Sequence, residues 1–128
     1  RIMEPGDSID VGDIKITAVP AYNIGKTFHP KENGWIGFLI EVEGVKIYHT
    51  GDTDFIPEMQ NIKPDIALVP VSGTFVMSAE EASMAVEMLK PQIVIPMHFG
   101  SLVGDLKDAL RFKNVLTRKI EVIIPEKQ

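Results

Sequence analysis

The sequence predicts an α/β fold with a mixed sheet and two main helices. Early in the chain, apolar and polar residues alternate on both sides of tight turns, a pattern typical of antiparallel hairpins. Two later runs are short and almost wholly apolar, which is typical of central strands. One amphipathic helical pattern lies between these two runs and another follows the second, which is the order of an α/β layered unit.

Two hairpins are predicted first. Between Ser8 and Ala21, apolar positions alternate around Gly12-Asp13, which indicates two tightly joined strands. A second pair of strands, Trp35 to Val42 and Val45 to Thr50, is joined by Glu43-Gly44. Together they predict four antiparallel strands.

A long polar loop separates these hairpins, running from Asn23 to Gly34. It contains Gly25 and Pro30 and shows no sustained period, so no regular element is expected in it. Loops of this length in compact domains are often functional, which makes its polar residues candidates for a binding site.

The second half of the chain predicts three strands. Ile66 to Val71 and Ile93 to Met97 are apolar enough to be core strands covered on both faces. Ile120 to Ile124 is expected to be the last strand.

Two helices are predicted beside these strands. Ser78 and Glu81 form a capping box at the start of the first, and Pro91 stops it. The second extends from about Asp105 to Asn114 with a half-apolar pattern. Residues 1–128 are therefore expected to fold as a single unit.

Composition narrows the class of protein. A net charge of −5 with interspersed acids and bases gives no basic patch for nucleic acid. The absence of cysteine leaves only histidine and carboxylates as metal ligands, and favours a reducing compartment such as the cytoplasm. No apolar run approaches the roughly 18 residues that a membrane span needs. Because the chain enters strand patterns soon after Arg1 with no initiator methionine, we expect a piece of a longer protein.

Two strand ends hold the first candidate site residues. Asp52 follows the strand Val45 to Thr50 after Gly51, where a carboxylate could bind a cation. A plain turn is the commoner explanation of such a sequence taken alone. His98 follows Ile93 to Met97 and could be a ligand, although a lone histidine beside apolar residues is more often a core or rim residue. Because both end apolar strands of one unit, we expect Asp52 and His98 at the same sheet edge.

The long loop adds further candidates. Lys26, His29 and Lys31 could bind an anion or complete a metal site, and Asn23 stands beside them. An equally good explanation is a solvated surface loop. His49, inside its strand, is expected to support or pack rather than to bind a metal.

Two runs resemble the C-terminal half of metallo-β-lactamase-superfamily hydrolases: Ile47 to Thr53 (IYHTGDT) and Pro96 to Gly100 (PMHFG). The resemblance covers essentially the whole chain. Among subgroups it is most similar to the lactonase-like and N-acyl-phosphatidylethanolamine phospholipase-like branch, with Pro20 to Asn23 before the loop and Gly100 to Gly104 after the last ligand.

This resemblance implies half of a four-layer αββα sandwich, with one or two metal ions at the edge of its sheets. By position, Asp52 matches the aspartate that bridges two metals, and His98 matches the last histidine ligand. Where the family has another histidine this sequence has Asn23, so either His29 substitutes or that ligand is absent. The family's HxHxDH motif is missing, since the histidines present are not spaced to form it.

The implied function is a metal-dependent hydrolase of a small anionic or ester substrate, meaning an ester, a lactone or a phosphodiester. It would be incomplete without an N-terminal half carrying HxHxDH. Zinc is the expected cofactor, and manganese or iron also suits histidine and carboxylate ligands. One rival is a non-catalytic half-domain that associates with itself or with a partner chain. Another is a metal-free small-molecule binding module.

Overall fold

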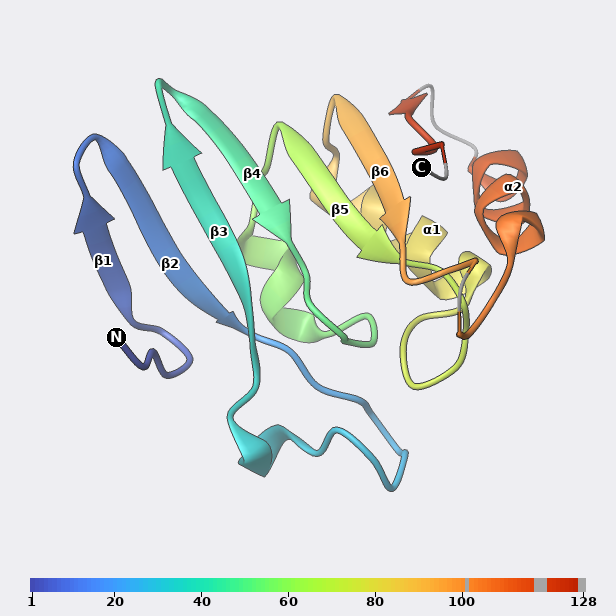
Figure 1. Ribbon diagram of the computed structural model, residues 1–128, viewed down its shortest axis with the longest axis horizontal. Helices are drawn as coiled ribbons and strands as arrows, with labels where there is room; N and C mark the ends of the chain where they lie inside the picture. The colour runs from blue at the N-terminus through green and yellow to red at the C-terminus, as the bar shows by residue number, and fades with distance from the viewer. Residues whose placement is uncertain (101, 117–119, 127–128) are drawn as a thin grey trace.

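One seven-stranded sheet in simple chain order organises the protein (Figure 1). The computed structural model describes residues 1–100, 102–116 and 120–126. Within them the strands are β1 (Ser8–Val11), β2 (Ile14–Pro20), β3 (Ile36–Val42), β4 (Val45–His49), β5 (Ile66–Pro70), β6 (Ile93–Met97) and β7 (Glu121–Val122). None of the helices in these ranges is long and apolar enough to cross a membrane.

The sheet is mixed, as the sequence predicts. Strands β1 to β4 pair antiparallel, whereas β4 to β7 pair parallel. The β3–β4 turn places both Glu43 (φ 51°) and Gly44 (φ 77°) in the left-handed region, which suits the right-handed twist of a hairpin. The parallel strands align their carboxyl ends at one edge of the sheet.

The two predicted helices are present, with the expected caps. Helix α1 (Ala79–Leu89) begins at Ser78, whose hydroxyl accepts from the Glu81 amide while the Glu81 carboxylate accepts from the Ser78 amide. Helix α2 (Leu106–Val115) begins with a second capping box at Asp105. Reciprocal caps satisfy backbone donors that a helix start otherwise leaves free.

Two short 3₁₀ helices add to the predicted elements. Helix η1 (Lys31–Asn33) lies in the long loop, and η2 (Pro57–Asn61) follows β4. The signal that could have revealed η2 is Pro57 at its first position, where a missing N–H costs nothing.

One face of the sheet is covered by helices. The buried side chains there include Tyr48, Ala67, Val69 and Val94 from the strands, Met59 from η2, Ala82, Val86 and Leu89 from α1, and Phe112 from α2. In Figure 1, α1 and η2 lie behind the strands. This layer is the core of the protein.

The opposite face is apolar but only half-buried. Pairing aligns five isoleucines in one row across the sheet, and each is half-buried: Ile16, Ile40, Ile47, Ile66 and Ile93. Coverage of β5 and β6 on both faces, which their apolar runs predict, is therefore not found among the described residues. Side chains in these two strands alternate between buried and half-buried, because helices pack on one side.

A few predicted bounds also change. The last strand, expected from Ile120 to Ile124, is limited to Glu121–Val122, where it pairs with β6. Ser101, which is part of the motif after His98, lies outside the described residues.

Candidate metal and substrate site

Asp52 and His98 lie close together at the carboxyl edge of the parallel strands. Asp52 follows β4 and His98 follows β6, with β5 between them. The His98 Nε2 atom is 3.8 Å from Asp52 Oδ1. The chain thus brings together a carboxylate and an imidazole from residues far apart in sequence, at the edge where α/β proteins bind ligands.

The His98 imidazole is oriented from behind by a serine. Ser72 Oγ lies 3.0 Å from His98 Nδ1, so the other ring nitrogen, Nε2, is directed to Asp52. The His98 backbone has φ 59°, a conformation uncommon outside glycine and often found at functional sites. Sequence reasoning missed Ser72, although it too follows a parallel strand, β5, at the same edge.

The Asp52 turn depends on close backbone packing. Gly51 has φ 70°, and a Cβ there would lie 3.0 Å from the Ile36 carbonyl oxygen. At Gly37 a Cβ would lie only 2.4 Å from the Thr50 carbonyl oxygen, so no larger residue fits. The Gly51 amide donates to His49 Nδ1 at 3.2 Å, and His49 thereby supports the turn. The Asp52 side chain remains 54% exposed.

A cavity of about 640 Å³ opens beside Asp52. It is lined by Met3, Ala21, His29, Gly34, Trp35, Ile36, Gly51 and Asp52. A space of this size can hold a small molecule. It places the long loop, through His29, on the same cavity as a candidate metal ligand.

His29 borders the cavity without joining a metal cluster. Its Nδ1 atom lies 3.1 Å from the Phe75 carbonyl oxygen, and its ring packs edge-on against Trp35 with centroids 4.6 Å apart. Among the described residues, no three histidine, cysteine, aspartate or glutamate side chains are placed to hold a metal. The structure therefore brings Asp52 and His98 together and leaves His29 apart from them.

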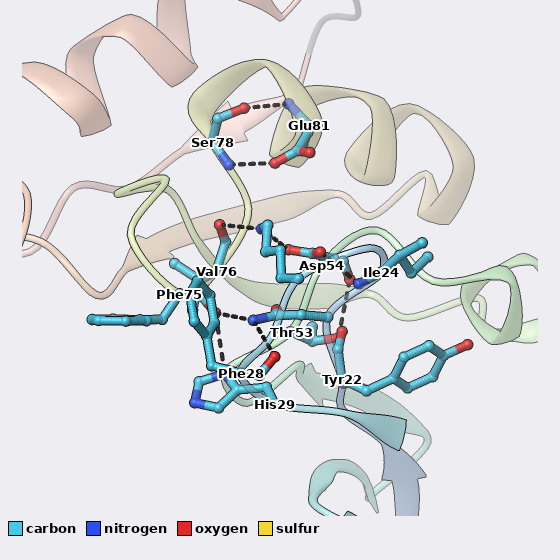
Figure 2. A network of polar contacts seen from close by, with 12 residues as sticks. Tyr22, Ile24, Phe28, His29, Thr53, Asp54, Phe75, Val76, Ser78 and Glu81 are labelled. Carbon is cyan, nitrogen blue, oxygen red and sulfur yellow. Dashed lines mark hydrogen bonds and ion pairs between the residues drawn. The ribbon is translucent and has the colours of Figure 1, made fainter. Parts of the chain in front are cut away.

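Asn23 fastens the long loop to the segment before α1. Its side-chain amide donates to the carbonyl oxygens of Phe75 at 2.9 Å and Phe28 at 3.3 Å, and its backbone amide donates to His29. The residue is 6% exposed, and its Oδ1 atom has no hydrogen-bond partner among the described residues. Figure 2 shows Phe28, His29 and Phe75 side by side. Asn23 is thus placed to hold the loop rather than to face solvent.

The two lysines of the loop pair with acids. Lys26 Nζ lies 2.5 Å from Asp54 Oδ1, and Asp54 Oδ2 also accepts from the Ile24 amide at 2.9 Å (Figure 2). The Asp54 side chain is only 6% exposed, so this pair is largely shielded from water. Lys31 Nζ lies 2.7 Å from Glu58 Oε1. Neither lysine lines the cavity beside Asp52.

Glu58 joins the loop to η2 and has a shifted pKa. Burial opposes its ionisation, but hydrogen bonds from Lys31 and from the Tyr22 hydroxyl (2.8 Å) outweigh burial and lower the Glu58 pKa. Burial, together with the bond to Glu58, raises the pKa of Tyr22. The bond to Glu58 raises the pKa of Lys31. Glu58 is therefore an ionised anchor near neutral pH.

The fold and the site together define an α/β domain with a two-residue candidate metal site at a sheet edge. Comparison with known families makes this more specific. Residues 1–98 match the model of the Beta-lactamase superfamily domain, and the chain belongs to this family.

Relatives and solved structures agree with that assignment. A UPF0173 metal-dependent hydrolase of Thermococcus onnurineus is 38% identical over 120 residues, which are 90% of this chain and 54% of the relative. A crystal structure from Parabacteroides distasonis, 32% identical, matches with a TM-score of 0.82 over 100% of this chain and 58% of that one. A Thermotoga maritima structure assigned as a Zn-dependent hydrolase of the metallo-beta-lactamase superfamily is 25% identical. It matches with a TM-score of 0.75 over 100% of this chain and 73% of that one. The chain spans about half the length of the curated relatives it matches.

Proposed function

We propose that this chain contributes Asp52 and His98 to the metal centre of a metal-dependent hydrolase. The supporting observation is the convergence of these two side chains at the sheet edge, 3.8 Å apart. The anchoring of His98 Nδ1 by Ser72 adds to it, because metal-binding histidines usually have their second nitrogen held by a neighbouring polar group. The donor set of one carboxylate and one imidazole suits zinc, and also manganese or iron.

The pair would need further ligands. Zinc sites usually have three or four protein ligands, and the described residues supply two at this edge. We propose that an HxHxDH-type segment supplies the others from an N-terminal half, whose sheet would cover the open apolar face. Relatives about twice as long support this proposal.

A divalent cation bound there would polarise a carbonyl or phosphoryl oxygen and increase the acidity of a water molecule. The residues of this chain would hold it: Asp52 by its carboxylate and His98 by Nε2, with Ser72 fixing the ring. The substrate would be a small ester, lactone or phosphodiester. The motifs around Asp52 and His98 favour the lactonase-like and N-acyl-phosphatidylethanolamine phospholipase-like branch.

Metal content of the protein purified from its natural gene tests the proposal. We expect one or two divalent ions per chain by plasma emission spectrometry. Asp52→Asn and His98→Asn should each weaken metal affinity by more than about tenfold, and Ser72→Ala by about tenfold, since supporting residues typically contribute 10–100-fold. Asp10→Asn, an exposed acid on β1, is the matched control. A protein without metal at saturating zinc would contradict the proposal.

The open apolar face favours a second candidate: a half-domain that associates with itself or with a partner chain. A contiguous exposed apolar surface usually marks an interface. The intact mass distinguishes the two. A natural protein of 14.2 kDa that binds no metal and sediments as a dimer would favour the half-domain. A mass well above that value with bound metal would favour the hydrolase.

A further inference from the structure

We propose that the cavity beside Asp52 binds an uncharged apolar group of the substrate, and that Trp35 is its main specificity-determining residue. This inference rests on the proposed function, because it takes Asp52 to be at the reacting centre. It goes further by choosing among the possible substrates: a neutral ester or lactone with an apolar substituent, rather than an anionic compound.

The lining of the cavity is mostly apolar, with His29 and Asp52 as its polar side chains. Met3, Ala21, Trp35 and Ile36 contribute apolar surface, and Asp52 is the charged residue among those that line it. Most small-molecule sites combine such apolar walls with few polar groups that set orientation. An apolar substituent could therefore occupy the cavity while its reacting group lies toward Asp52.

Trp35, which lines this cavity, is 46% exposed. Two further exposed aromatic rings, Phe75 (43%) and Phe28 (37%), lie next to His29, another lining residue. Trp35 contacts the ring of His29, and Phe28 packs edge-on against Phe75 with centroids 4.7 Å apart. Grouped exposed aromatic rings are typical of binding surfaces, since they offer large contact areas with few rotatable bonds.

The long loop forms one wall of the cavity through His29 and Gly34, and contacts within the protein hold this wall in place. Asn23 joins Phe28 to Phe75 through their carbonyl oxygens, and the buried pair of Lys26 and Asp54 fixes the same loop from another side. His29 and Phe75 have φ values of 54° and 63°, so this arrangement keeps two residues in an uncommon conformation. A preformed wall loses little entropy on binding. Asn23 is thus a positioning residue for the wall.

Charge disfavours an anionic group in the cavity. Lys26 and Lys31, the cations of the loop, are paired with Asp54 and Glu58 and do not line the cavity. Among the residues that line the cavity there is no lysine or arginine that could pair with a carboxylate or phosphate. An uncharged group needs no such partner.

Natural protein saturated with zinc and labelled with ¹⁵N allows a direct test through the indole N–H signal of Trp35. The indole N–H signal that disappears in Trp35→Phe is the reporter. Benzamide and benzoate are the probes, since they share a phenyl ring and differ in charge. We expect benzamide to shift the Trp35 signal saturably, with an affinity at least about threefold above that of benzoate. No saturable shift, or equal affinities, would overturn the inference.

Variants test whether benzamide binding depends on the residues that form or position the wall. Trp35→Leu, followed by line broadening of benzamide itself, should weaken binding about three- to tenfold, the loss expected for an aromatic contact. Leu110→Ala, an exposed apolar residue on α2, should leave it unchanged. Asn23→Asp should weaken it while the protein stays folded by circular dichroism. Unchanged affinity in Trp35→Leu would contradict the assignment. Metal titration of the same protein separately reports failure of the proposed centre.

Discussion

The two faces of the sheet differ more in their surroundings than in their side chains. On the covered face Tyr48, Val69 and Val94 are fully buried beneath helices, with 0% exposure. On the other face Ile47, Leu68 and Ile95, in matching strands, are only half-buried. A solvent-facing side of a sheet normally has polar residues at alternate positions. The strands therefore have apolar residues suited to burial on both faces, while the described residues provide helices over only one of them.

Shortening a buried side chain on the covered face should have the largest effect on stability. Leu89 of α1 is 0% exposed within the core, so Leu89→Ala should lower the free energy of unfolding by about 2–5 kcal/mol through lost transfer energy and a cavity. Ile47→Ala on the open face is the matched control. Its loss should be clearly smaller in the 128-residue chain. Urea denaturation followed by circular dichroism measures both, and equal losses would contradict the distinction between the faces.

A smaller effect is expected at a buried hydroxyl on the covered face. The Tyr48 hydroxyl has no hydrogen-bond partner among the described residues, and burial raises the pKa of Tyr48 well above its usual value, with a further contribution from Glu58. Tyr48→Phe should leave the free energy of unfolding unchanged or raise it by up to about 1 kcal/mol, because it removes an unpaired polar group. A decrease of more than about 1 kcal/mol in the free energy of unfolding, measured by urea denaturation, would show that the hydroxyl has a partner.

The smallest effect should be a dependence of stability on pH, caused by the ionisation of Glu58 at the border of the covered face. The folded-state pKa of Glu58 is lowered, so its contribution is present above the unfolded value of about 4.3 and is lost as the pH falls through the folded pKa. Thermal unfolding of the wild type and Glu58→Gln between pH 7 and pH 3 should therefore converge on acidification. A constant difference in Tm between the two proteins across this pH range would show that the Glu58 carboxylate does not contribute to stability.

Local patterns predicted most of the fold. Alternation and turn residues located the hairpins, and the Ser78–Glu81 capping box located the start of α1, because these signals depend on neighbours in sequence. The open face could not be predicted in this way. An apolar strand such as β5 has the same composition whether one face or two are covered, and the answer depends on which elements pack against it.

The candidate site was predictable in part for the same reason. Asp52 and His98 were expected at one edge because parallel strands align their ends, and the structure places them together. The pairing of Lys26 with Asp54 joins residues 28 positions apart, and no local pattern indicates it. The same holds for Ser72 and His98. Contacts between residues far apart in sequence can be identified only from the structure.

The order of the strands has a consequence for how the chain folds. Each strand pairs with its neighbours in sequence from β1 to β7, but the separation between paired residues differs along the sheet. In the hairpins it is short, as between Val42 and Val45, and hairpins form in about 1–10 μs. In the parallel pairs it is long, as between Ile66 and Ile93, and such pairing is slow. During synthesis, the β1–β4 meander can assemble before the parallel unit has left the ribosome, and it then offers β4 as the template on which β5 pairs.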